Sequence, residues 1–120
     1  CANIQSHVDN VAKQREWNIK WNSEVNDPNY DWAELRSFVK REEREVPELV
    51  DQVVATQIKE KFGMLRFYYD GGDEHISGMV TMAESWAAST CEVCGNPGKY
   101  RGKQWFYTAC DEHTSEKDRE

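Results

Sequence analysis

The sequence predicts an α+β fold, in which helices pack on a small antiparallel β-hairpin and a treble-clef, zinc-ribbon-like module closes the C-terminus. Apolar residues recur at helical spacing near both ends of the first ninety residues. Alternating apolar residues flank a glycine between residues 53 and 70. Three cysteines and a histidine then follow at metal-ligand spacing. We expect residues 1–90 to form an α+β core and residues 91–120 to form a zinc-binding module packed on it.

The composition suits one small domain with an aromatic core. The chain has 120 residues, only three of them leucine, against fourteen aromatic residues. No apolar run approaches the roughly 18 residues that span a bilayer, and no secretion signal is visible. Cysteines without such a signal indicate a reducing cytoplasm, where metal binding is commoner than disulfides. Because the chain begins at Cys1 inside a helical pattern, we expect its natural N-terminus to lie upstream.

The charge argues against a general nucleic-acid-coating function. The net charge is −7, and residues 1–52, 53–90 and 91–120 are each acidic overall. Phosphate backbones are bound by clustered Lys and Arg. Any anion-binding site must therefore be a local one.

The N-terminal third predicts two helices. The first covers residues 1–15, with an apolar face of Ile4, Val8, Val11 and Ala12. The alternating residues Trp17, Ile19 and Trp21 leave the next segment ambiguous, and NDPNYDW indicates a turn. A second helix would be capped by Asp31 and would bury Trp32, Leu35, Phe38 and Val39. It would run into REERE as a solvated face and end or restart at Pro47. His7 is interpreted as a packing residue. The tryptophans of this third are interpreted as core or interface residues: Trp17, Trp21 and Trp32.

Residues 53–70 predict a β-hairpin that turns near Gly63. One face would hold Val54, Thr56, Ile58 and Phe62 against Leu65, Phe67 and Tyr69. The other would hold Gln57 and the candidate ligand-binding residues Lys59, Lys61, Arg66 and Tyr68. Three cations and a phenol suit a phosphate or nucleotide, with the Arg66 guanidinium as a planar fork. The alternative is an ordinary solvated face that Glu60 and Asp70 neutralise.

The next segment predicts a helix that leads directly to Cys91. GGD at 71–73 supplies a turn and a cap, and the apolar face comprises Ile76, Met79, Val80, Ala83, Trp86 and Ala87. His75 lies beside Asp73 and Glu74, but an acid–base pair needs a substrate pocket, of which the sequence gives no sign.

The cysteine pattern predicts one structural Zn²⁺ ion. Cys91-x2-Cys94-x15-Cys110-x2-His113 places two ligand pairs on tight turns joined by a loop long enough to close the site. Gly95 suits a zinc knuckle. Residues 100–107 predict a hairpin turning near Gly102, and CDEH predicts the first turn of a terminal helix.

Other uses of these cysteines fit less well. A redox pair belongs at the head of a helix, whereas this motif follows one. A disulfide framework would give Cys1 an awkward partner and would not suit a reducing compartment. A catalytic zinc site keeps one position open for water, but four protein ligands close a tetrahedral ion, and Glu112 between two ligands would point away from it.

The finger hairpin offers a second candidate contact surface. Charge and aromatic residues alternate over Lys99, Tyr100, Arg101 and Lys103, a pattern that suits a nucleic-acid backbone or an acidic protein. Ordinary surface lysines around a small finger are the alternative. The sequence contains no nucleophile elbow, P-loop or dinucleotide fingerprint, and this favours a protein that is not an enzyme.

Residues 53–113 resemble a family of small zinc-finger proteins of bacteriophages and prophages. The similar motifs are an IKEKFG–LRFYY hairpin, an AES helix and a CEVCG…CDEH tail; Met64 and Trp86 depart from the family pattern without touching a zinc ligand. The resemblance implies an accessory phage protein of the bacterial cytoplasm, with a further segment before Cys1. It implies no particular activity.

Three functions therefore stand as hypotheses. The first is a non-enzymatic binding protein that captures a host protein or a small anionic ligand, such as a signalling nucleotide, to blunt host defence. The second is a nucleic-acid-binding or transcription-accessory finger. The third is a nuclease-type enzyme, since treble clefs also scaffold nuclease sites.

Overall fold

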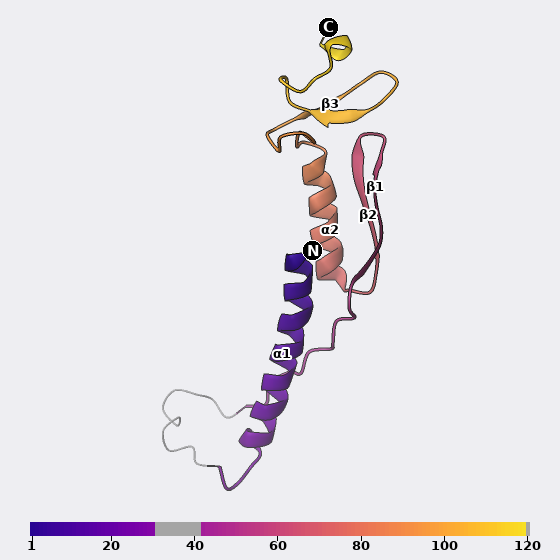
Figure 1. Cartoon of the computed structure of the whole chain (residues 1–120). Coiled ribbons are helices and arrows are strands. Elements are labelled where there is room, and N and C mark those ends of the chain that lie inside the picture. The colour runs from indigo at the N-terminus through magenta and orange to yellow at the C-terminus, as the bar shows by residue number, and fades with distance from the viewer. Residues whose placement is uncertain (31–41, 120) are drawn as a thin grey trace. The chain divides into compact units, whose positions relative to one another are not determined.

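The structure, a computed structural model, describes residues 1–30 and 42–119 (Figure 1). The chain forms two compact units, Cys1–Asp51 and Gln52–Glu120. This division falls after Asp51, and the predicted boundary between residues 90 and 91 stays a prediction. Helices and small antiparallel sheets are both present, as an α+β fold requires. Within the described residues, no helix has the length and apolar character that crossing a membrane requires.

Helix α1 (Ala2–Val25) forms the first unit together with an extended segment. It is longer than predicted, because the ambiguous residues 17–21 continue the helix. Val8 is buried on the predicted apolar face, whereas Trp17 is 66% exposed. The second predicted helix, from Asp31 through Trp32, Leu35, Phe38 and Val39, lies outside the described residues.

Residues 42–50 form neither helix nor strand and are held by side chains of α1. The Trp21 indole donates a hydrogen bond to the Glu42 carbonyl at 2.8 Å. The Asn18 amide donates to the Glu45 carbonyl at 2.8 Å, and Arg15 donates to the Pro47 carbonyl at 2.7 Å. These bonds satisfy backbone acceptors that have no partner in a regular element.

Strands β1 (Val54–Lys61) and β2 (Met64–Asp70) form the predicted hairpin. Phe62 and Gly63 connect them with positive φ angles of 53° and 74°, as a tight two-residue hairpin turn requires. The Glu60 carboxylate accepts a hydrogen bond from the Gly63 N–H and holds the turn.

A β-bulge corrects the predicted faces of this hairpin. The register shifts between Ala55 and Gln57, so Thr56 is an extra residue on β1. Ile58 pairs with Phe67, as expected, but the extra residue inverts the alternation before it. Val54 therefore pairs with Asp70 and lies on the face of Lys59, so its predicted place beside Ile58 is wrong.

Helix α2 (Glu74–Ala87) packs on β2 (Figure 1). The Asp73 carboxylate caps it by accepting a hydrogen bond from the Ile76 N–H at 3.0 Å. Ile76 and Val80 are buried, whereas Trp86 of the predicted apolar face is 63% exposed. The helix also covers the outer edge of β2, because the Glu84 carboxylate accepts the Phe67 N–H at 2.9 Å.

The C-terminal segment contains a second hairpin, β3 (Lys99–Arg101) with β4 (Tyr107–Ala109), and a short 3₁₀ turn, Glu116–Asp118. The predicted turn is confirmed at Gly102, where φ is 100°. The predicted α-helix starting at CDEH is absent from the described residues up to 119, where this stretch forms a turn. A helix there would have no apolar face to bury, because every residue from 111 to 119 is polar or charged.

The first hairpin packs against the second at Gly63. The Thr108 hydroxyl, which is buried, donates to the Gly63 carbonyl at 3.2 Å. A Cβ atom on Gly63 would lie 2.8 Å from the Tyr107 nitrogen and 2.9 Å from the Phe106 carbonyl carbon. The two backbones therefore meet at a distance that only glycine permits.

Candidate metal centre

The first ligand pair lies on a loop that its own backbone hydrogen bonds close. The Cys91 N–H donates to the Asn96 carbonyl at 2.8 Å, and the Gly95 N–H donates to the Cys91 carbonyl at 2.9 Å. Gly95 has a φ of 76°, as expected for a knuckle. An isolated bridge between Thr90 and Pro97 holds the two ends of the loop together.

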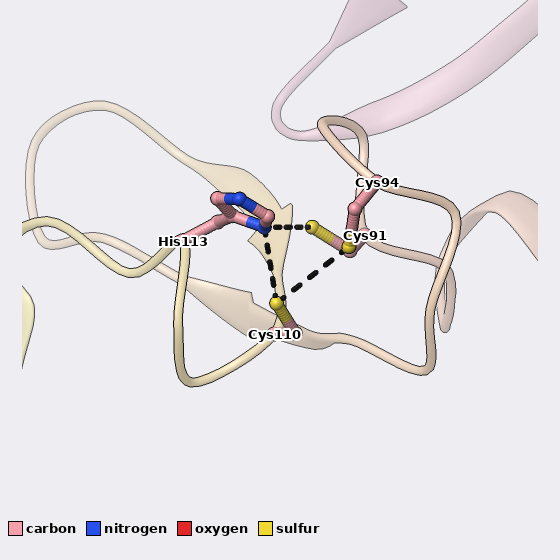
Figure 2. A group of neighbouring side chains, drawn as sticks. All are labelled: Cys91, Cys94, Cys110 and His113. Carbon is pink, nitrogen blue, oxygen red and sulfur yellow. Dashed lines mark hydrogen bonds between the residues drawn. The ribbon is translucent and has the colours of Figure 1, made fainter.

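The second ligand pair follows strand β4 directly. The His113 N–H donates to the Cys110 carbonyl at 3.2 Å, and the Thr114 hydroxyl donates to the same carbonyl at 2.7 Å. Thr114 is buried. This turn brings the two ligands, three positions apart, to the same side of the chain (Figure 2).

The four predicted ligands converge on one point. The candidate ligand atoms of Cys91, Cys94, Cys110 and His113 all lie within 4.8 Å of one another. Figure 2 shows the three sulfurs and the His113 ring grouped between the two loops. The cluster is half-exposed, with Cys91 buried and His113 at the surface.

The spacing fits a tetrahedral metal ion bound by sulfur and nitrogen. Zinc–sulfur bonds of about 2.3 Å place two sulfurs of a tetrahedron about 3.8 Å apart, and a sulfur and a nitrogen slightly closer. The Cys94 and Cys110 sulfurs are 3.8 Å apart. The His113 Nδ1 atom lies 3.6 Å from the Cys91 sulfur and 3.2 Å from the Cys110 sulfur. Three thiolates and an imidazole are also donors that suit zinc.

The thiols differ in acidity. Backbone hydrogen bonding by Cys110, with further bonds from Cys94 and Val93, lowers the pKa of Cys91 from 9.0 to about 6 against the opposing effect of burial. Backbone hydrogen bonding by Asn96 favours the Cys94 thiolate, but desolvation and the neighbouring thiols of Cys91 and Cys110 outweigh it and raise the pKa of Cys94. Close thiolates repel one another, and a bound cation removes that repulsion.

The candidate ligand residues of the first hairpin share one face. Lys59 pairs with Arg66 and Gln57 with Tyr68 across the strands, and Lys61 lies two positions beyond Lys59. The Lys59 ammonium lies 5.4 Å from the centre of the Tyr68 ring. Of the two carboxylates expected to neutralise this face, Glu60 points to the other one and binds Gly63, whereas Asp70 lies on the same face as Arg66, opposite Val54.

The candidate contact residues of the finger hairpin are less available. Arg101 forms an ion pair with Asp111 and its side chain is only 19% exposed. Hydrogen bonding and the charge of Arg101 hold the pKa of Asp111 below its usual range. Tyr100 stacks on Phe106 with ring centres 5.2 Å apart. Lys99 and Lys103 remain exposed on this hairpin.

Several contacts that shape the site have no local signature in the sequence. Thr108 and Gly63 join the two hairpins, and the pairing is not local, so no short-range pattern announces it. Trp105 is 76% exposed in the finger loop, and exposed tryptophan is a mark of interaction surfaces, but no sequence pattern predicts its exposure.

No protein-family model matches the chain, and comparisons with curated proteins and with solved structures found no match.

Proposed function

We propose that this protein is a non-enzymatic zinc-binding protein that captures a small anionic ligand, such as a nucleotide, on the cationic face of its first hairpin. This face is defined by Lys59, Lys61, Arg66 and Tyr68. The zinc-bound tail, which we propose to be of the treble-clef type, supports the turn of that hairpin.

The observation that carries the proposal is the cross-strand pair of Lys59 and Arg66. Neighbouring cations destabilise a strand pair, since like charges directly opposite one another repel. In the described part of the chain, neither cation forms an ion pair with a carboxylate. An anion bound between them relieves that repulsion, and the guanidinium of Arg66 can bind a phosphate in two places at once.

The four-ligand metal cluster supports a structural role for the ion. When Cys91, Cys94, Cys110 and His113 all bind Zn²⁺, no coordination position remains for a catalytic water. The metal would then stabilise the fold of residues 91–119 and leave ligand binding to the hairpin.

The resemblance to phage and prophage proteins supports a cellular setting for this activity. We place the protein in the cytoplasm of a bacterial host, where it would bind a host signalling nucleotide or a host protein and so weaken a defence response. A host protein with an acidic surface would use the same cationic face.

Calorimetric titration with nucleotides tests the proposal. Adenosine and guanosine triphosphates and cyclic dinucleotides serve as probes, against the wild-type chain and Arg66→Ala. We expect binding that Arg66→Ala weakens at least about tenfold and that Arg66→Lys restores only in part. Lys13→Ala on α1 is the control, because it removes an exposed cation that lies in the other unit. Zinc content should be unchanged in every variant, and no heat from any of these ligands would refute the proposal.

A nucleic-acid-binding finger is the second candidate, and the exposed Lys99, Lys103 and Tyr100 favour it. Such binding would weaken steeply with salt and on charge reversal of Lys99, Arg101 and Lys103. A nuclease-type enzyme would instead show metal-dependent turnover beyond one stoichiometric zinc ion.

A further inference from the structure

Helix α2 carries an exposed ridge that the rest of its unit does not cover. Gly78, Met82 and Trp86 follow one another at intervals of four and so lie in a row along the helix. Met82 is 62% and Trp86 63% exposed. We call these three residues the α2 ridge.

Gly78 in this ridge has no packing role within the described chain. Glycine is the least favourable residue in a helix interior apart from proline. A Cβ atom built on Gly78 would meet no atom within 4 Å, so no neighbour in the chain requires its absence. A notch in the middle of an exposed apolar row instead leaves room for a side chain from outside.

We propose that the α2 ridge pairs with the α2 ridge of a second copy of this chain, with the two helices antiparallel. Met82 lies midway between Gly78 and Trp86, so a two-fold axis through Met82 places each Trp86 over the Gly78 notch of the other copy. A small residue at one end and a large one at the other make the row complementary to itself, as an isologous interface requires.

The α2 ridge is a part of the surface on which two copies can meet without bringing like charges together. With a net charge of −7, two copies repel one another over most of their surface. Helix α2 has only three ionisable side chains, Glu74, His75 and Glu84. Glu84 is turned to the Phe67 N–H of its own sheet. In the antiparallel pairing, positions 74 and 75 face positions 90 and 89, which are Thr90 and Ser89, so no like charges meet.

The area of the α2 ridge sets the expected dissociation constant of the dimer. Stable protein interfaces bury about 1,600 Å² in total. A Trp and a Met that are each more than half exposed, from two copies, supply on the order of 600 Å². We therefore expect a weak dimer, with a dissociation constant of about 10 to 500 μM.

Sedimentation velocity over about 5 μM to 1 mM of the zinc-loaded full chain tests the pairing. We expect Trp86→Ala and Gly78→Trp each to weaken the dimer at least about tenfold, the first by emptying the notch and the second by filling it. The double variant G78W/W86A restores a large residue opposite a small one, and its dissociation constant should return to within about threefold of the wild type. A chain that stays monomeric up to 1 mM, or a double variant as weak as the single ones, would overturn the proposal.

Cross-linking provides a measurement that does not depend on the stability of those variants. In a Cys1→Ser background, Met82→Cys places two thiols at the two-fold axis, and oxidation should yield a covalent dimer. Thr81→Cys is the matched control, because residue 81 is exposed on the same helix but is turned away from the ridge by one residue. Equal cross-linking at both positions contradicts the pairing. A monomeric chain in which residue 82 is covered by the N-terminal unit of the same chain would also contradict the pairing.

Discussion

Replacing Gly63 by alanine should destabilise the second unit more than the same change at Gly95, which has a similar backbone angle. Gly63 has a φ of 74°, a region that alanine enters at a cost of roughly 1–2 kcal/mol. The new methyl group would also lie 2.8 Å from the Tyr107 nitrogen, and both near neighbours are backbone atoms that cannot rotate away. Overpacking of this kind costs about 1–3 kcal/mol. The expected loss is therefore about 2–5 kcal/mol.

Gly95→Ala separates the two contributions. Gly95 has nearly the same φ, 76°, but a Cβ atom there would meet nothing within 4 Å. The Gly95→Ala variant should therefore lose only the stability that the positive φ angle costs, roughly 1–2 kcal/mol. The difference between the two variants, about 1–3 kcal/mol, then measures the close approach of the two hairpins.

Urea titration of the full chain with saturating zinc, followed by NMR signals of the β1 and β2 amides, measures both losses. These signals report the second unit alone, whereas circular dichroism would be dominated by α1. We expect the midpoint to fall without a change of slope. Equal losses in the two variants would mean that the hairpins do not pack through Gly63, and the contact would have to be withdrawn.

Three further predictions concern the metal, the sheet edge and the helix. Acidification from pH 7 toward about pH 5 should release zinc and unfold residues 91–119, because the thiols and the imidazole must be deprotonated to bind the metal. A zinc-sensitive dye measures the release. Cys110→Ser removes one ligand, so a variant that still retained zinc at pH 5 would contradict the four-ligand site. Glu84→Ala should cost about 1–2 kcal/mol by leaving the Phe67 N–H without its acceptor, and Glu84→Gln should cost less because an amide oxygen remains; hydrogen exchange at Phe67 distinguishes them. Gly78→Ala, measured at low protein concentration, should stabilise the chain by about 0.5–1 kcal/mol, and a loss of stability would show that the space beside Gly78 is filled.

The parts of the fold that the sequence predicts well depend on local chemistry. The metal cluster follows from ligand spacing, which two tight turns convert directly into proximity. The start of α2 follows from the Asp73 cap, and the hairpin turn follows from a glycine between two alternating runs. The cap and the turn are decided by residues within a few positions of one another, and the metal cluster by two such pairs of ligands.

The errors arise where distant contacts decide. Nothing in the residues around Thr56 announces a bulge, yet one extra residue moves Val54 to the opposite face. The predicted terminal helix is a different kind of error: CDEH suggested its first turn, although the segment that follows has no apolar side to bury. The predicted apolar face of α2 is real, but periodicity cannot say that its own sheet covers Ile76 and Val80 and leaves Trp86 exposed.

The metal centre and the cationic face are connected through the physics of small sheets. A two-stranded hairpin is marginally stable by itself, so β1 and β2 need support from outside the sheet. Helix α2 supports the outer edge of β2 through Glu84. The finger hairpin supports the turn through Thr108 and Gly63, and Thr108 is followed two residues later by the ligand Cys110. A metal ion bound by the four ligands would therefore stabilise the end of the hairpin where Lys61 and Arg66 lie. The proposed structural metal site and the proposed binding face are therefore compatible with one another, because the first would support the strands that carry the second.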